Sequence, residues 1–146
     1  MYKHILIPTD GSELSRKAIE HGVALAKSIN AKVTAVTVTV PFHVFAIEPD
    51  MVTDTPEQYE KHAADLAAKA LNVAKEAAKT AGVNYDTMCV GHEHPYRAII
   101  DAAAQRACDL VVMASHGRRG ISAIVLGSET VKVLTHSAVP VLVVRG

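Results

Sequence analysis

The segment Asp109-Leu110-Val111-Val112-Met113-Ala114-Ser115-His116-Gly117 passes from an apolar run into a turn that continues through Arg118-Arg119-Gly120 to Gly127-Ser128. The apolar run predicts a β-strand, and a helix is predicted to begin at Ser128. Glycine allows backbone N–H groups to converge on one guest, and a helix N-terminus adds a partial positive charge. This strand–loop–helix unit favours a phosphate or another anion as its ligand. The alternative is a connector that merely requires small residues.

Strand-like and helical patterns alternate along the whole chain. Val, Ile, Leu and Thr dominate the predicted strands, whereas the predicted helices repeat small apolar residues at helical spacing. Thr55, Pro56 and Gln58 form a capping box at one helix start, and Gly82 is predicted to end that helix. The predicted strands span residues 3–8, 32–40, 83–90, 109–114 and 139–144, and the predicted helices span 14–29, 56–81, 95–107 and 128–136.

The first, fourth and fifth predicted strands are apolar almost without alternation, which is typical of a sheet buried on both faces. Strands that alternate with helices imply a parallel sheet joined by right-handed crossovers. We therefore predict one α/β domain over residues 1–146, built on an open five-stranded parallel sheet with helices on both faces.

Composition limits the function classes. The 146 residues include 15 Lys and Arg and 15 Asp and Glu, so the chain lacks the basic excess typical of proteins that bind nucleic acid. The longest apolar stretch, 33–47, is interrupted and is shorter than the ~20 residues that cross a bilayer. We expect no signal peptide before the first strand, and Cys89 and Cys108 form no C-x-x-C motif. We expect a cytoplasmic protein with buried free thiols and neither nucleic acid nor membrane as a partner.

Two loops carry polar residues suited to a ligand. Ligands of open parallel sheets lie beyond the carboxyl ends of the strands, so Thr9-Asp10-Gly11-Ser12 and 115–128 are the candidates. We predict that the first and fourth strands are neighbours and that these loops face one ligand. Asp10 would accept hydrogen bonds from sugar hydroxyls, while Gly117, Gly127 and Ser128 would hold phosphates. The alternative role for Asp10 is a turn or helix cap, and Ser128 can also serve as an N-cap.

These residues resemble the universal stress protein family. The resemblance covers the opening Ile5–Ser12, the loop 115–120, the turn Leu126-Gly127-Ser128 and the closing Val139–Arg145. The nucleotide-binding branch of that family carries Gly-x2-Gly-x9-Gly-Ser/Thr. Gly117 matches the second glycine, and nine residues separate it from Gly127-Ser128. Ala114 stands where the motif has its first glycine, and a position that required φ > 0 would be strained by alanine.

The resemblance implies a strand order of 3-2-1-4-5 and an adenine nucleotide, ATP or AMP, with Mg²⁺ or Mn²⁺ as a further option beside the phosphates. Asp10 would then face the ribose, and the backbone of Val38 would contact adenine. Family members of this branch usually form homodimers, often by pairing the last strand, here 139–144. The full candidate site is Pro8, Thr9, Asp10, Val38, Met113, Ala114, Ser115, His116, Gly117, Arg118, Gly120, Gly127 and Ser128.

Several alternatives stay open at this level. Arg118 and Arg119 would either reach a phosphate or remain solvated, and His116 would either transfer a proton or pack under the loop. His92 and His94 would either belong to a metal cluster or lead into a helix. No G-x-x-x-x-G-K-[ST] motif is present, and the loop 115–128 has no carboxylate that would position water or a metal.

The favoured hypothesis is therefore a nucleotide-binding regulatory protein that acts on an unknown protein partner. At most we expect weak ATP hydrolysis. The alternatives are a nucleotide-free interaction module and a slow ATP hydrolase.

Overall fold

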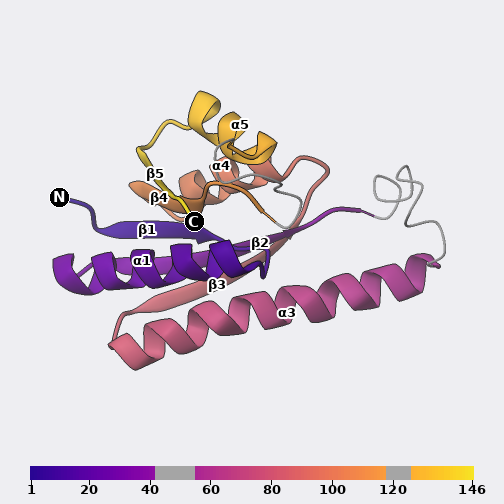
Figure 1. Ribbon diagram of the computed structural model, residues 1–146, viewed down its shortest axis with the longest axis horizontal. Helices are drawn as coiled ribbons and strands as arrows, with labels where there is room; N and C mark the ends of the chain where they lie inside the picture. Colours follow the sequence, from indigo (N-terminus) through magenta and orange to yellow (C-terminus); the bar gives the residue numbers. More distant parts are fainter. Residues whose placement is uncertain (42–54, 118–125) are drawn as a thin grey trace.

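The computed structural model describes residues 1–41, 55–117 and 126–146, and strands and helices alternate through them (Figure 1). All strand pairings are parallel, in the order β3-β2-β1-β4-β5. The expected α/β fold and its strand order are thus confirmed. The strands are β1 (His4–Pro8), β2 (Lys32–Thr39), β3 (Tyr85–Gly91), β4 (Leu110–Ala114) and β5 (Val141–Val144), and the helices are α1 (Glu13–Ile29), α3 (Pro56–Ala81), α4 (Pro95–Gln105) and α5 (Ser128–His136).

β1 lies at the centre of the sheet. Ile5 pairs with Val33 of β2 on one side and with Leu110 of β4 on the other. The predicted neighbourhood of the first and fourth strands is therefore confirmed. Because the strands are parallel, the loops after β1 and β4 leave the sheet at the same edge.

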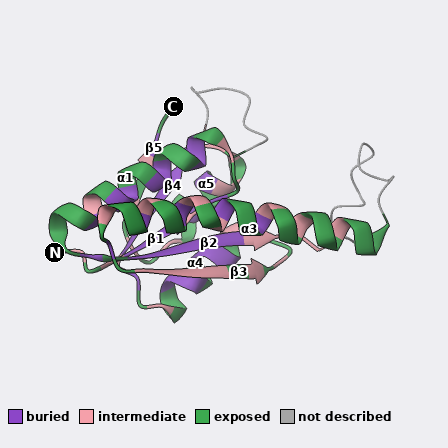
Figure 2. Cartoon of the chain, turned by 90° about the horizontal axis from the view of Figure 1, so that it is seen from below, coloured by how far each residue is buried: buried purple, intermediate pink, exposed green. Residues whose placement is uncertain are grey.

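Helices cover both faces of the sheet, and each face has its own apolar core (Figure 2). α1 and α3 pack over one face through small residues such as Ala18, Ala26 and Ala74. α4 and α5 cover the opposite face, where Ile99 and Val133 are buried. Aliphatic and alanine side chains supply nearly all of this burial, as the low aromatic content requires.

Close packing of α1 on the sheet depends on Gly22. A Cβ atom added there would lie well under 3.0 Å from the buried Ile7 side chain and 3.6 Å from Val112. A side chain at this position would force Ile7 to shift, so glycine favours close helix–sheet contact although it is a poor helix former.

The helix ends follow the local sequence. Thr55 accepts the N–H of Gln58, and the Gln58 side chain accepts the N–H of Thr55, so the predicted capping box is confirmed. Gly82 ends α3 in the left-handed region with φ 72°, also as predicted. Buried residues of α3 begin only at Ala67, and its first turns extend beyond the sheet (Figures 1 and 2).

Several predicted element bounds were wrong by one or two residues. β5 begins at Val141 rather than Val139, because the Ser137 hydroxyl bonds both the carbonyl and the N–H of Val139 and Pro140 has no N–H. α4 ends at Gln105 because Ala107 adopts the left-handed conformation, with φ 54°. The N–H of Cys108 then donates to Ala103 O, a carbonyl of the helix.

The two cysteines differ in environment, which corrects the expectation that both are buried. Cys108 is buried, whereas Cys89 is exposed on β3, an outermost strand of the sheet. Desolvation by burial, together with the charge of Asp109, raises the pKa of the Cys108 thiol to about 11. Only the deprotonated thiol reacts as a nucleophile, so the two side chains are expected to react very differently.

We expect a thiol reagent at pH 8 to modify Cys89 quickly and Cys108 only after unfolding. At a pKa of about 11, roughly 0.1% of Cys108 would be thiolate at that pH, even if the reagent could reach it. Absorbance of released thionitrobenzoate measures both rates. Cys89→Ser should remove the fast phase, and a fast phase that persists in this variant would contradict the assignment.

Candidate functional site

The loop after β1 is fixed by its own polar residues. The N–H of Thr9 donates to Val36 O at 2.8 Å, which continues the sheet by one residue. The N–H of Ser12 donates to Asp10 Oδ1 at 2.9 Å, and Ser12 in turn caps α1 by accepting the N–H of Ser15. Gly11 has φ 81°, a conformation that favours glycine. Asp10 therefore has the turn role that its sequence context allowed.

The loop after β4 is closed at its base by two hydrogen bonds. Gly127 N–H donates to Ser115 O at 2.7 Å, and Thr130 Oγ1 donates to Ala114 O at 2.9 Å. Ser115 N–H also donates to Val144 O at 2.9 Å, which ties the start of the loop to β5. The first turn of α5 is thus held against the last residue of β4.

The two loops meet at Asp10 and Gly117. A Cβ atom built on Gly117 would lie well under 3.0 Å from Asp10 Oδ2. One carboxylate oxygen of Asp10 therefore serves its own turn, while the other faces the backbone of the second loop. Gly127 is also tightly placed, since a Cβ there would lie 3.0 Å from His116 Cα. Gly117 therefore leaves room for the Asp10 carboxylate, and Gly127 allows a close approach to the backbone of His116.

α5 begins at the mouth of this loop without a side-chain cap. Its N-cap is Gly127, whereas α1 and α3 are capped by Ser12 and Thr55. The first N–H groups of a helix carry the positive end of its dipole. An anion at this end would supply the acceptors that a capping side chain supplies elsewhere. Ser128, the first residue of α5, is exposed and lies in this position.

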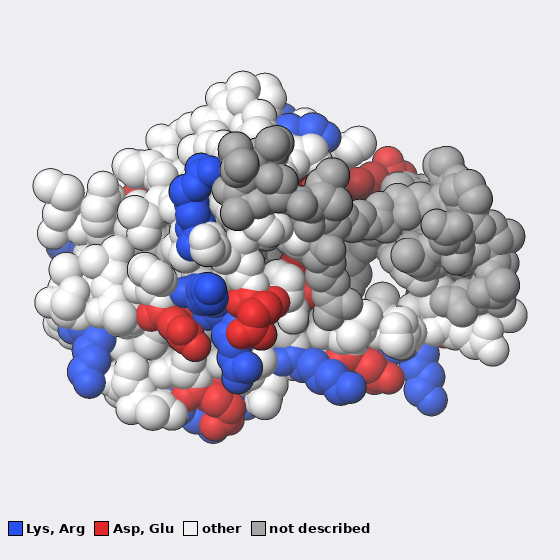
Figure 3. Space-filling model, viewed as in Figure 1, with Lys and Arg blue, Asp and Glu red and all other residues white. Residues whose placement is uncertain are grey.

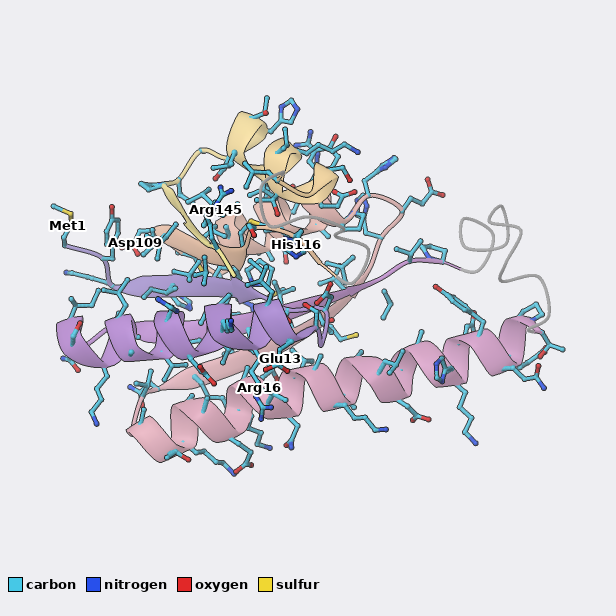
Figure 4. The ribbon with its side chains drawn as sticks, in the orientation of Figure 1. Met1, Glu13, Arg16, Asp109, His116 and Arg145 are labelled. Carbon is cyan, nitrogen blue, oxygen red and sulfur yellow. The ribbon has the colours of Figure 1, made fainter. Side chains whose placement is uncertain are left out.

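The remaining predicted residues lie near the same edge of the sheet. Met113, Ala114 and Ser115 are buried at the end of β4, and His116 is half-buried with Nδ1 3.2 Å from Ser115 Oγ. Asp109 and His116 lie at opposite ends of β4 (Figure 4). Pro8 is the last residue of β1 and Val38 lies near the end of β2, both half-buried. Arg118 and Gly120, with Arg119, fall outside the described residues.

Ala114 is accommodated without backbone strain. Among described residues, the non-glycine residues with positive φ are Asn30 and Ala107, so Ala114 is not in the left-handed region. Its side chain belongs to the apolar core on the α1 side of the sheet. The methyl group in place of the motif's first glycine is therefore packed in the protein interior.

Sequence reasoning missed Thr130 and Glu129. Thr130 is buried and ties α5 to β4, and Glu129 Oε2 accepts the N–H of Tyr96 at 3.0 Å. The position of Thr130 in the first turn of a predicted helix was the one available indication, because a hydroxyl side chain there often forms a hydrogen bond with nearby backbone. The partner of Glu129 lies 33 residues away, and no local pattern predicts it.

The loop His92-Glu93-His94 leads into α4. His92 Nδ1 accepts the N–H of His94 at 2.8 Å, and His94 occupies the N-cap of α4. Within residues 1–41, 55–117 and 126–146, no group of three His, Cys, Asp or Glu side chains could hold a metal ion. In the same ranges no helix is long and apolar enough to span a membrane.

Two surface features lie along α1 and α3. A hollow of about 70 Å³ lies between the start of α1 and α3, where Glu13 and Arg16 project from α1 (Figure 4). It is lined in part by Thr9, Ser12 and Val73 and is far smaller than a typical ligand pocket of roughly 300 Å³ or more. Acidic and basic side chains are interleaved over α1 and α3 (Figure 3).

The family comparison agrees with this fold. The model of the universal stress protein family matches residues 1–145. The chain belongs to the universal stress protein family. Universal stress protein MJ0531 of Methanocaldococcus jannaschii is 33% identical over 148 aligned positions, which cover 99% of this chain and 83% of the relative.

Solved structures of the universal stress protein family share the architecture. The structure of MJ0577 from the same organism superimposes with a TM-score of 0.79 at 30% identity, covering 99% of this chain and 96% of that one. A universal stress protein in complex with cAMP superimposes with a TM-score of 0.68 at 26% identity, covering 98% and 96% of the two chains.

Proposed function

We propose that this universal stress protein binds an adenine nucleotide, ATP or AMP, as a homodimer and uses nucleotide occupancy to regulate a protein partner in a stress response. The observation that carries the proposal is the contact of Asp10 with the backbone of Gly117, beside the uncapped start of α5. A carboxylate then lies beside the loop that leads to the positive end of the α5 dipole. This pairing suits a ligand with sugar hydroxyls at one end and phosphate at the other.

The proposed pose places the ribose at Asp10 and the phosphates at Gly117, Gly127 and Ser128. The ribose hydroxyls would be recognised by the Asp10 carboxylate, whose Oδ1 also accepts the N–H of Ser12. The base would lie toward the end of β2, near Val38. The relative in complex with cAMP supports an adenine nucleotide as the ligand class. Mg²⁺ or Mn²⁺ would join only through the phosphates.

Isothermal titration of the purified protein with ATP, AMP and GTP tests the proposal. We expect saturable binding of ATP or AMP and much weaker binding of GTP. Mass spectrometry of small molecules released from protein purified without added ligand would identify a co-purified nucleotide. Absence of both saturable binding and released adenylate would favour the nucleotide-free interaction module. Phosphate release equal to that of a no-protein blank would exclude the slow hydrolase.

The proposed dimer uses β5, which pairs with β4 on one side and forms an edge of the sheet. Leu142 of β5 is 44% exposed, and Val131 and Leu134 of α5 are 44% and 42% exposed. An exposed apolar edge strand is an association hazard that proteins normally cover. A second copy of β5 would supply both backbone partners and apolar contact.

We expect Leu142→Glu to convert the dimer to a monomer, because the substitution would place a carboxylate in an apolar interface. Sedimentation velocity measures the change in mass. Ile29→Glu is the matched control, since Ile29 is 37% exposed on α1, outside the proposed interface, and should leave the dimer intact. A wild-type protein that sediments as a monomer at all concentrations would overturn the proposed assembly.

A further inference from the structure

We infer that Glu129 is a positioning residue that fixes the anion-binding end of α5 by capping the neighbouring helix α4. This inference rests on the proposed nucleotide function. The N-cap of α4 is His94, whose side chain makes no capping hydrogen bond, and the first turn of α4 has no acidic residue. Glu129 of α5 supplies the missing acceptor, because its Oε2 accepts a hydrogen bond from the N–H of Tyr96 at 3.0 Å. α4 is therefore capped from another helix.

The position of α5 depends on few contacts. Only Thr130 and Val133 of its nine residues are buried. Thr130 fixes the first turn to Ala114, and Glu129 fixes the same turn to α4. Glu129 immediately follows Ser128, so movement of its side-chain anchor would displace the N–H groups proposed to hold phosphate. The hydrogen bond from Glu129 thus determines where the start of α5 lies relative to the loop after β4.

The negative charge of Glu129 allows a positioning role to be distinguished from a purely electrostatic one. A carboxylate in the first turn of α5 would by itself repel a bound phosphate. Here the carboxylate is engaged by the N-terminal end of α4, and its Oε1 lies 3.8 Å from Lys132 Nζ. Lys132 is also held over the Tyr96 ring, 5.5 Å from its centroid. Electrostatics alone predicts that removing Glu129 strengthens anion binding, whereas positioning predicts that removal weakens it.

Titration of ATP and AMP into three variants separates these effects. Glu129→Ala should weaken binding by about tenfold, the factor expected for one charge-assisted hydrogen bond. Glu129→Gln keeps an acceptor for Tyr96 N–H without the charge and should restore wild-type affinity or exceed it. Glu57→Ala removes a carboxylate from the first turn of α3 and is the matched control, with no expected change. Equal or tighter binding by Glu129→Ala would overturn the inference.

Hydrogen exchange of the nucleotide-free protein tests the bridge independently of ligand. Glu129→Ala should speed exchange at the amides of Tyr96 and Gly127, while amides of β1 keep their protection. Unchanged exchange at Gly127 would overturn the inference whatever the affinities are. Failure of the wild-type protein to bind any adenine nucleotide would overturn the proposed function instead, and the exchange measurement would distinguish the two failures.

Discussion

Replacing Gly117 by alanine should lower the affinity for ATP by about tenfold or more, with little change in stability. The new Cβ would occupy the space of Asp10 Oδ2 and force that carboxylate away from the ligand. Gly117 is exposed and the displaced atoms are the end of a surface side chain, so the fold has room to adjust. Calorimetric titration and thermal unfolding together measure the two quantities.

A double-mutant cycle makes this expectation specific. Asp10→Ala should itself weaken binding, and Gly117→Ala should then add little in the Asp10→Ala background, because both changes remove the same contact. Additive losses in the cycle would contradict the proposed role of the contact. Gly127→Val is a less informative variant, since its side chain would meet the backbone of His116 and disturb the loop directly.

Replacing Gly22 by valine should lower the free energy of unfolding by about 3 kcal/mol. The added methyl groups would press on Ile7, which is 0% exposed, and would also approach Val112. A glycine within a helix normally gains about 1 kcal/mol when replaced by alanine, so local propensity and packing oppose each other here. We expect the packing cost to exceed the propensity gain, because both Ile7 and Val112 are already close to the added Cβ in a densely packed interior.

Urea denaturation of Gly22→Ala, Gly22→Val and Ala24→Gly measures both effects on one helix. Ala24 is exposed on α1, so Ala24→Gly reports the propensity cost alone. Both Gly22 variants should unfold at lower urea concentration than the wild type, and valine should be the more severe. A stabilised Gly22→Ala would show that α1 can shift away from the sheet without cost.

The sequence predicted those features that depend on local chemistry or on the period of apolar residues. Thr55 with Gln58 and Gly82 mark the ends of α3 because capping is decided within a few residues. The placement of the loops after β1 and β4 at the same edge followed from the topology of parallel sheets. Cys89 was misassigned because its exposure depends on β3 lying at the edge of the sheet, which its own residues do not determine.

The candidate site was only partly accessible from sequence. The two carboxylate oxygens of Asp10 have different neighbours, because Oδ1 accepts the N–H of Ser12 and Oδ2 faces Gly117. The second contact depends on tertiary structure, so the local sequence does not predict it. The hydrogen bond from Tyr96 N–H to Glu129 joins two helices that follow different strands, and the spacing of residues in the sequence does not predict it. The family motif named Gly127 but not Thr130, whose hydroxyl closes the base of the loop.

The central place of β1 has a consequence for synthesis of the chain. β1 is synthesised before β4 and must later pair with it, although β4 is made about a hundred residues afterwards. During that interval β1, β2 and β3 can pair, but the β4-facing side of β1 stays open on the nascent chain. Such an edge invites pairing with other chains, so translation should be the stage at which this protein most needs a chaperone.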